Sequence, residues 1–392
     1  MLGLGVGIAW LLLVLYLLSR ALRQSAAYHR AAVPTRVSEL LRSVTIVVPV
    51  RNEIDNIASC LAGLASQSCL RGRSLLVVDD ESEDGTAAFV ESYARTEPRL
   101  RLVHAGPLPP GWMGKPHACW RGALLGDGDW LCFIDADVRA SRDLVASALA
   151  AAEADRIDML SLYPAQELGS FWERVIIPAG LIIIACAKPL PRPGAATLPR
   201  DKINGQILLV RRDAYFGVGG HAAVRGEVCE DKALATLIER AGYRYEAMSA
   251  EHLARVRMYR DFGSLWEGFA KNAVEIFGSP TATLLAAAAA ALVGWTAVLL
   301  PVLLGVAVWH DPTLPEMVGL GLAACGSGVA IGISFGATRH FHVPAVFGFT
   351  FALGYTMAAC LAARSMIGQF KGRVTWKGRT YQLKRNAAPD AP

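Results

Sequence analysis

The sequence has no CxxC pair, although eight cysteines are spread through its 392 residues. They are Cys60, Cys69, Cys119, Cys132, Cys186, Cys229, Cys325 and Cys360. Most of them have apolar neighbours in the sequence, which is typical of reduced cysteines that pack in a protein interior. The pattern therefore argues against a disulfide framework and against a zinc site.

A large net charge is also absent, because 39 basic residues and 34 acidic ones leave a net charge of +5. The basic residues gather after the first apolar run and near the end of the chain. They are Arg20, Arg23 and Arg30, and then Lys371, Arg373, Lys377, Arg379, Lys384 and Arg385. Because both groups lie beside apolar segments, we expect them to contact anionic lipid head groups, and we expect no binding of nucleic acid.

The first apolar run lacks a basic segment before it and a clear small-residue cleavage site after it. It covers residues 2–18 and is long enough to cross the core of a bilayer. We therefore expect residues 1–20 to be an uncleaved transmembrane anchor. The arginines that follow place the next part of the chain in the cytoplasm by the positive-inside rule.

Long apolar runs return in the last third of the chain, at about residues 281–309, 317–337 and 343–363. We expect transmembrane helices over residues 281–364, a basic tail over residues 365–392, and a globular cytoplasmic domain over residues 37–278. Three crossings after the domain would put the basic tail outside, against the charge rule. Either one segment is re-entrant or the tail is an exception.

The globular part has no evident internal repeat, and strand-like segments alternate in it with helix-like ones. This predicts an α/β domain with a largely parallel sheet. Strands are expected near residues 44–50, 74–80, 99–105, 130–137 and 157–164, and helices near residues 54–66, 87–96 and 141–154. Ligands bind beyond the carboxyl ends of strands in such sheets. The polar residues at these ends are Asn52, Glu53, Asp79, Asp80, Asp135 and Asp137.

The second half of the globular part is less regular. Residues 175–187 are apolar but short, and they predict an interfacial or buried helix. The proline-rich connector at residues 188–199 is a candidate for a mobile loop over a site. Residues 203–215 predict a strand that enters a turn, and residues 230–242 predict an amphipathic helix.

Two acids, Asp135 and Asp137, lie one residue apart at the end of a strand-like run. Carboxylates at these positions project to the same side, so both can reach one cation or one phosphate-bearing ligand. Their hard oxygens suit magnesium or manganese. The alternative is a polar turn in which Asp137 or Ser141 caps the next helix.

Six motifs follow one another in the chain: VPVRNE, VVDDESEDGT, GWMGK, FIDAD, NGQ and CED. In this order and spacing, over residues 44–231, they resemble a family 2 glycosyltransferase of the GT-A fold. The tail motif TWKGRTY resembles a signature of membrane glycosyltransferases that act on polycyclic or polyisoprenoid lipids, including the hopanoid-associated and carotenoid-glycosylating groups. The resemblance implies a GT-A (nucleotide-diphospho-sugar transferase) domain accompanied by transmembrane α-helices.

The resemblance implies a nucleotide-sugar donor, a UDP-sugar, whose diphosphate is neutralised by Mg²⁺ or Mn²⁺. Asp137 is implied to be the more direct metal ligand, with Asp135 nearer the ribose and the metal-bound waters. Asp79 and Asp80 correspond to acids that contact the uracil and ribose in relatives.

Pro49 and Glu53 are implied to line the same nucleotide pocket. The alternative for the acidic loop after Asp80 is a solvated turn that caps a helix, and we keep that interpretation for Glu81, Glu83 and Asp84.

By resemblance, the ED pair Glu230 and Asp231 supplies the general base, and we assign this role to Asp231. One base without a carboxylate nucleophile predicts direct displacement with inversion, unlike the two-carboxylate arrangement of glycoside hydrolysis. The alternative for this pair is helix capping, since the helix dipole favours carboxylates in a first turn.

Three further polar residues have two interpretations each. Lys115 lies between glycine and proline in a predicted loop and suits a phosphate or a nucleobase, or it is a surface lysine. Asn204 and Gln206 suit the donor sugar, or they satisfy the backbone of their own loop.

The QxxRW motif of many processive and several lipid-directed relatives is missing from this chain. This absence and the small number of apolar segments argue against a polysaccharide synthase with a translocating channel. Other cations are candidates for contact with the diphosphate. They are Arg257, Arg260, Lys271, Lys377 and Arg379.

Together these features predict an inverting, metal-dependent enzyme that moves a sugar from a nucleotide donor to a lipid hydroxyl. The expected location is the cytoplasmic face of a bacterial cytoplasmic (inner) membrane, in a multi-pass protein. Hopanoid-associated glycosyltransferases are the nearest resemblance. A polysaccharide synthase and a non-catalytic lipid-binding scaffold are the alternatives, and the sequence leaves the oligomeric state open.

Overall fold

The computed structural model describes residues 1–30, 32–35, 43–67, 75–190 and 203–382. The chain forms two compact units. The sheet unit comprises residues 27–167, 192–258 and 375–392, and the helical unit comprises residues 1–26, 168–191 and 259–374. Residues 168–191 and 259–278 were expected in the globular domain and belong to the helical unit instead. The tail from Thr375 belongs to the sheet unit.

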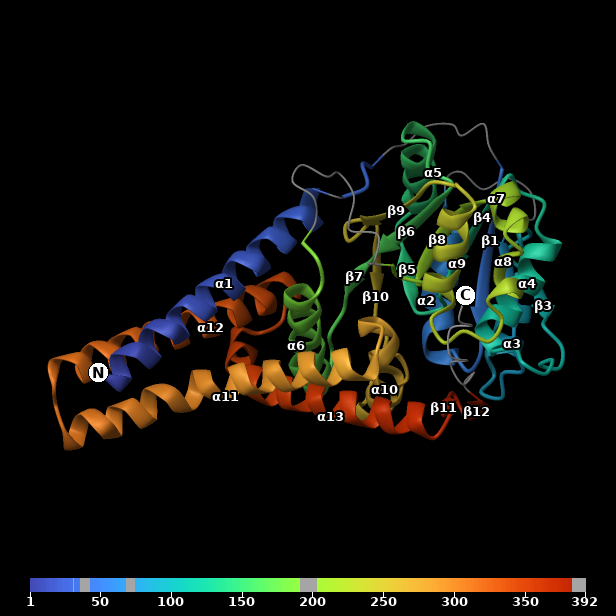
Figure 1. Cartoon of the computed structure of the whole chain (residues 1–392). Helices are drawn as coiled ribbons and strands as arrows, with labels where there is room; N and C mark the ends of the chain where they lie inside the picture. Colours follow the sequence, from blue (N-terminus) through green and yellow to red (C-terminus); the bar gives the residue numbers. More distant parts are fainter. Residues whose placement is uncertain (31, 36–42, 68–74, 191–202, 383–392) are drawn as a thin grey trace, which may run out of the picture. The chain divides into compact units, whose positions relative to one another are not determined.

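A seven-stranded sheet forms the centre of the sheet unit, in the order β3-β2-β1-β4-β8-β6-β9 (Figure 1). Its strands are β1 (Val44–Val50), β2 (Leu75–Asp79), β3 (Leu100–His104), β4 (Trp130–Ile134), β6 (Met159–Tyr163), β8 (Ile207–Arg211) and β9 (Tyr245–Ser249). Strand β8 runs antiparallel to both of its neighbours, β4 and β6, whereas the other neighbouring strands are parallel. The predicted α/β fold with a mostly parallel sheet is therefore confirmed.

Helices cover both faces of this sheet. The strands are runs of apolar, often β-branched residues, as strands buried on both faces require. Alternate side chains of β1 enter two cores: Ile46 and Val48 pack with helices α2 (Ile54–Ala65) and α5 (Leu144–Ala154), and Val47 packs with α4 (Gly114–Leu125). The remaining helices of the unit are α3 (Thr86–Ala94), α7 (Arg212–Gly217), α8 (Gly220–Ala223) and α9 (Glu230–Arg240).

Two smaller sheets were not predicted from the sequence. Strands β5 (Val138–Ala140), β7 (Ala165–Gln166) and β10 (Ala254–Val256) form one of them, in the order β5-β10-β7. Strands β11 (Arg373–Trp376) and β12 (Arg379–Gln382) form the other, a hairpin at the end of the described chain. Strands of two to four residues leave too short a pattern to be recognised in a sequence.

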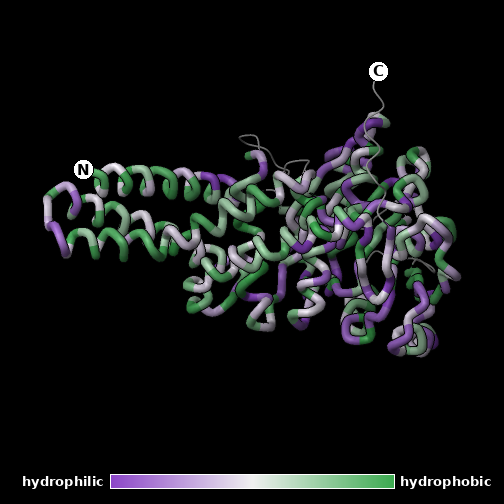
Figure 2. The backbone as a smooth tube through the Cα atoms, turned by 60° about the horizontal axis from the view of Figure 1, so that its bottom comes forward, coloured by the Kyte–Doolittle hydropathy of each residue, from purple (hydrophilic) through white to green (hydrophobic). Residues whose placement is uncertain are grey.

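The helical unit contains four helices that are long and apolar enough to cross a membrane, at residues 2–29, 280–310, 314–340 and 345–370. Its elements are α1 (Leu2–Arg30), α6 (Phe171–Ala187), α10 (Phe262–Phe277), α11 (Pro280–His310), α12 (Leu314–His340), η1 (Ala345–Thr350) and α13 (Phe351–Phe370). The long helices are predominantly hydrophobic along their length (Figure 2). Glycine lets α1 and α12 approach closely, because a Cβ at Gly326 would lie 2.6 Å from the Trp10 ring.

Candidate active site

The carboxyl ends of β2, β1 and β4 lie side by side in the sheet, and the acidic motifs follow these three strands. Asn52 and Glu53 come after β1. Asp80 comes directly after β2, which ends at Asp79, and Asp135 directly follows β4. The strand ends therefore bring together the residues that the sequence predicted there.

Lys115 connects three of the motifs. Its Nζ lies 2.7 Å from Asp135 Oδ1 and 3.3 Å from Glu230 Oε1, and it donates a hydrogen bond of 3.3 Å to the carbonyl of Gly205. Burial lowers the pKa of Lys115, but Asp135 and Glu230 outweigh burial and hold it well above its ordinary value. The surface-lysine alternative does not match this position, because the ammonium group is directed at two carboxylates.

Lys115 was expected in a loop, but it lies in the first turn of α4. Pro116 follows it, and proline suits the first turn of a helix because the backbone N–H there has no intrahelical partner. The proline and the two glycines of the motif therefore indicated a helix start as much as a loop.

Asp137 has a buried oxygen, Oδ1, with no hydrogen-bond partner among the described residues. Burial, followed by the charges of Asp135 and Glu53, raises the pKa of Asp137 well above its usual range. A cation beside Asp137 would satisfy the orphaned oxygen and offset the excess negative charge, so these residues fit a divalent metal. Within the described residues no group of three His, Cys, Asp or Glu side chains is arranged to hold an ion. Such a cation would therefore need oxygens from water and a bound diphosphate as well.

Asp231 lies in the first turn of α9, after Glu230. Burial, with a further contribution from Glu230, raises the pKa of Asp231 to about 6. A Cβ at residue 205 would lie 3.0 Å from Asp231 Oδ2, so Gly205 leaves room for this carboxylate. The N-cap residue is Cys229, without a capping side-chain hydrogen bond, and Asp231 Oδ1 accepts from the neighbouring Lys232 N–H at 2.8 Å.

Asn204 and Gln206 bond to each other. The side-chain amide of Asn204 donates to Gln206 Oε1 at 2.7 Å, and the backbone N–H of Gln206 donates to Asn204 Oδ1 at 2.9 Å. The backbone of Asn204 is in turn held by the hydroxyl of Ser161. The loop alternative thus accounts for these contacts, and a role toward a donor sugar stays a prediction.

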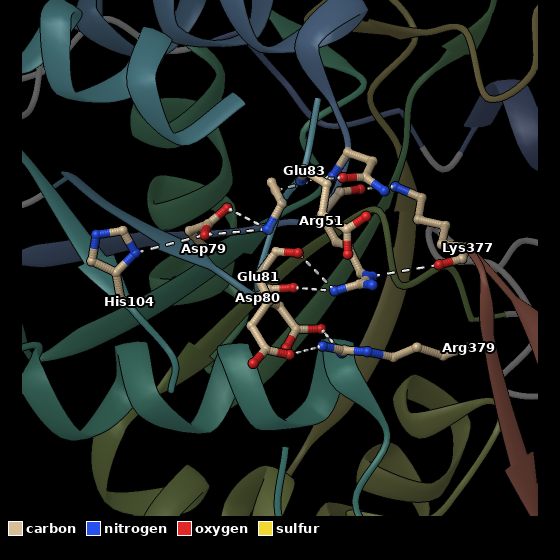
Figure 3. A network of polar contacts seen from close by, with 10 residues as sticks. Arg51, Asp79, Asp80, Glu81, Glu83, His104, Lys377 and Arg379 are labelled. Carbon is tan, nitrogen blue, oxygen red and sulfur yellow. Dashed lines mark hydrogen bonds and ion pairs between the residues drawn. The ribbon is translucent and has the colours of Figure 1, made fainter. Parts of the chain in front are cut away.

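The hairpin β11–β12 brings two cations to the ends of β1 and β2. Lys377 pairs with Glu53. Arg379 pairs with Asp80 and Glu81 (Figure 3). Arg379 leaves Asp80 Oδ1 buried and without a hydrogen-bond partner in the described part of the chain. Burial raises the pKa of Asp80, while the charge of Arg379 acts to lower it.

Arg51 is a residue that sequence reasoning missed. Its Nη1 donates to the carbonyls of Asp80 and Glu81 at 2.7 Å and 2.9 Å, and its Nε donates to the carbonyl of Lys377 at 3.4 Å (Figure 3). The only signal for it was its position beside Asn52 and Glu53 at a strand end.

The acidic loop after β2 also contains structural contacts. Asp84 accepts hydrogen bonds from the backbone N–H groups of Ile54 and Thr86 at 3.0 Å, at the starts of α2 and α3. This agrees with the helix-capping interpretation of Asp84. In the same network, Asp79 Oδ2 lies 3.6 Å from Nδ1 of His104, which is largely exposed (Figure 3).

The other predicted residues are placed as follows. Pro49 is half-buried in β1 and lies opposite Val78 of β2. Arg257 directly follows β10 in the sheet unit, whereas Arg260 and Lys271 belong to the helical unit. Most of the proline-rich connector, from residue 191 onward, lies outside the described residues, as do Lys384 and Arg385.

Residues 45–230 match the model of the family described as Glycosyl transferase family 2. The matched residues belong to the sheet unit except for residues 168–191, which belong to the helical unit, so the resemblance to family 2 glycosyltransferases centres on the sheet unit. A mannosyltransferase from Pyrobaculum calidifontis, solved in complex with GDP-Man and Mn²⁺, resembles the chain with a TM-score of 0.51 at 20% identity, over 94% of this chain and 98% of that one. This likeness confirms the GT-A fold.

Curated relatives were also found in Staphylococcus aureus. The 4,4'-diaponeurosporenoate glycosyltransferase of strain MRSA252 is 26% identical over 240 residues, which are 59% of this chain. The protein of the same name from strain USA300 is 26% identical over 239 residues. The match spans about 60% of the length of these relatives. The resemblance to carotenoid-type lipid glycosyltransferases is thereby confirmed.

Proposed function

We propose that this protein transfers a sugar from a nucleotide-sugar to a hydroxyl group of a membrane lipid, with inversion at the anomeric carbon. The observation that carries the proposal is the position of Lys115, which pairs both with Asp135, a proposed donor- and metal-binding acid, and with Glu230 of the ED pair. A donor-binding centre and a base are needed together for glycosyl transfer, whereas a binding scaffold needs no base.

The residues at the strand ends bind the donor. Asp137 and Asp135 would hold a divalent cation, Mg²⁺ or Mn²⁺, and the bound cation would neutralise negative charge on the leaving diphosphate. Asp79 and Asp80 bind the nucleoside, next to Pro49 and Glu53.

Asp231 accepts the proton of the acceptor hydroxyl as that oxygen attacks the anomeric carbon. Lys115 supports this step because its ammonium group pairs with both Asp135 and Glu230 and compensates their negative charges. No second carboxylate is assigned as a nucleophile, so the product has the inverted configuration.

The membrane face is the cytoplasmic one. Arginines follow the first apolar helix, and they favour the cytoplasmic side for the sheet unit. Lys377 and Arg379, which follow the last apolar helix, pair with Glu53 and Asp80 of the sheet unit. These pairs support an even number of crossings between Met258 and Thr375. Of the three candidate spans there, residues 345–370 are the most buried, and we assign them to a segment that does not cross.

The acceptor is a polycyclic or polyisoprenoid lipid. Support comes from the name of the Staphylococcus aureus relatives, 4,4'-diaponeurosporenoate glycosyltransferase, and from the four apolar helices. A hopanoid acceptor rests on the resemblance of the TWKGRTY tail alone, and a UDP-sugar donor rests on the resemblance of the acidic motifs. Both belong to the proposal.

A panel experiment tests donor and acceptor together. The protein, purified in detergent, is incubated with UDP-, GDP- and ADP-sugars, with and without Mn²⁺, and with hopanoid, carotenoid and glycerolipid acceptors. We expect nucleotide release that depends on Mn²⁺ and on a polycyclic or polyisoprenoid acceptor. Nucleotide binding without transfer to any lipid would favour the scaffold alternative, and no nucleotide binding would refute the donor site.

A further inference from the structure

The C-terminal hairpin has an unusual turn. Lys377 and Gly378 join β11 to β12 with φ angles of 46° and 76°. Positive φ at both central residues defines the two-residue turns that match the twist of a hairpin, and asparagine or aspartate followed by glycine normally occupies them. Lysine is disfavoured in this conformation. A contact made by the side chain of Lys377 would explain why lysine occupies this position.

That contact is with the end of β1. Lys377 Nζ donates to the carbonyl of Arg51 at 2.8 Å and pairs with the carboxylate of Glu53. In return, Arg51 Nε donates to the carbonyl of Lys377 at 3.4 Å. These contacts hold the turn against the VPVRNE motif, which is the first motif of the proposed nucleotide pocket.

Arg379 makes the second attachment, 299 positions away in the chain from its partner Asp80. One guanidinium nitrogen binds Asp80 Oδ2, and the other binds Glu81 Oε2. The Asp80 side chain is 4% exposed, whereas that of Glu81 is 53% exposed. An ion pair with the exposed Glu81 would be enough to fasten the tail. The pairing with buried Asp80 requires desolvation of both charges, which a simple attachment does not need.

The start of α4 is built around this pair. A Cβ added at Gly114 would lie 2.2 Å from Asp80 Oδ2 and 3.1 Å from Arg379 Nη1. The glycine therefore leaves the room that the carboxylate and guanidinium occupy. With Oδ2 held by Arg379, the other oxygen of Asp80 is buried and has no hydrogen-bond partner among the described residues. A buried, orphaned acceptor beside a proposed ligand pocket points to a donor group supplied by the ligand.

We infer that the C-terminal hairpin belongs to the donor site. Arg379 is a positioning residue that binds Asp80 Oδ2. The other oxygen, Asp80 Oδ1, is thereby oriented to accept a hydrogen bond from the nucleoside of the donor. Lys377 holds Oε1 of Glu53, whose Oε2 accepts a hydrogen bond from Asn56 at 2.8 Å. The inference rests on the proposed function, because it requires that a nucleotide binds at these strand ends.

The test compares three variants of the full chain in detergent, with UDP and GDP as probes in the presence of Mn²⁺. Arg379→Gln removes the guanidinium, Arg379→Lys keeps the charge but loses the two-pronged contact, and Arg373→Gln removes the same charge from an exposed position of the same hairpin. Isothermal titration gives Kd, and thermal melting shows that each variant is folded.

We expect Arg379→Gln to weaken nucleotide binding by about tenfold or more. Arg379→Lys should recover part of the loss, and Arg373→Gln should bind as the wild type does. In turnover, Arg379→Gln should raise KM for the donor with little change in kcat, because the contact is made equally before and during transfer.

A double-mutant cycle separates positioning from simple attachment. If Arg379 acts through Asp80, then Arg379→Gln costs less than about twofold when it is added to Asp80→Asn. Unchanged binding in Arg379→Gln, tighter binding, or a full additional loss in the Asp80→Asn background would each overturn the inference. A wild-type protein that binds neither UDP nor GDP would instead refute the proposed function on which the inference rests.

Discussion

Lys115 and Asp135 form an ion pair at the centre of the candidate site, with Nζ 2.7 Å from Oδ1. The same ammonium group lies 3.3 Å from Glu230 Oε1, next to the proposed base Asp231. One cation thus compensates acids on the metal side and on the base side. Coulombic coupling of this kind is strong over short distances in a partly buried site. The ionisation of the two sides should therefore depend on Lys115.

Substitution of Lys115 by methionine should shift the acidic limb of the pH–rate profile upward. Without the ammonium group, Asp135 and Asp231 lose a positive neighbour that lowers their pKa, so both pKa values rise and less of the base is ionised at neutral pH. We expect kcat/KM at pH 7 to fall by about tenfold or more, with part of the loss recovered at pH 8.5. Arg121→Met, an exposed position of the same helix α4, is the matched control. An equal loss at every pH would contradict this coupling.

Substitution of Asp137 by asparagine should abolish the response to Mn²⁺ while the protein stays folded. The change removes the charge that the cation requires, and loss of a metal's contribution of several kcal/mol corresponds to a decrease of about 100-fold or more. The measurement is activity against Mn²⁺ concentration, before and after chelation of metal by EDTA. Asp155→Asn alters an exposed acid of the same domain and should leave the titration unchanged. Full activity of Asp137→Asn, or of the wild type in EDTA, would refute metal dependence at this position.

The pH dependence of kcat/KM should report Asp231. A base must be ionised to accept a proton, and the pKa of Asp231 is raised to about 6 by burial and by Glu230. The carboxylate form is present above this pKa and is lost as the pH falls through it, so kcat/KM should decrease about tenfold per pH unit below about pH 6. Initial rates between pH 4.5 and about pH 8 test this. Rates that remain constant down to pH 5 would exclude Asp231 as the titrating base.

Positions before and after residues 259–374 of the helical unit should be accessible from the same side of the membrane. We propose single cysteines in a cysteine-free background, at Asp155 in the sheet unit and at Thr380 in the hairpin, both of which are exposed. A membrane-impermeant maleimide should modify both in inverted vesicles and neither in intact spheroplasts. Modification of the two positions from opposite sides would show an odd number of crossings between them and would separate the hairpin from the donor site.

The sequence predicted what depends on local pattern. The strand β1 (Val44–Val50) and the helices α2 (Ile54–Ala65) and α9 (Glu230–Arg240) were expected within a few residues of their observed bounds. Their apolar periodicity is read directly from neighbouring residues. The acids at the strand ends were predicted to lie close together because a parallel sheet places the carboxyl ends of its strands at one edge.

Contacts between distant positions could not be read in this way. The tail motif TWKGRTY was noted for its resemblance to a family signature, but its sequence does not predict that Arg379 binds Asp80. Strand β8 was predicted, but its antiparallel direction was not, because direction depends on the path of the chain between strands. Arg51 was overlooked because its role is to donate to backbone carbonyls, which any residue can supply.

Transfer of a labelled sugar to lipid by the wild type and by Asp231→Asn tests the central claim most directly. Each protein is placed in nanodiscs with bacterial lipid extract, Mn²⁺ and a UDP-sugar labelled in the sugar, and the labelled lipid is isolated and its anomeric configuration determined. We predict a labelled lipid of inverted configuration from the wild type and none from Asp231→Asn. Retention of configuration, or equal labelling by the two proteins, would contradict the account.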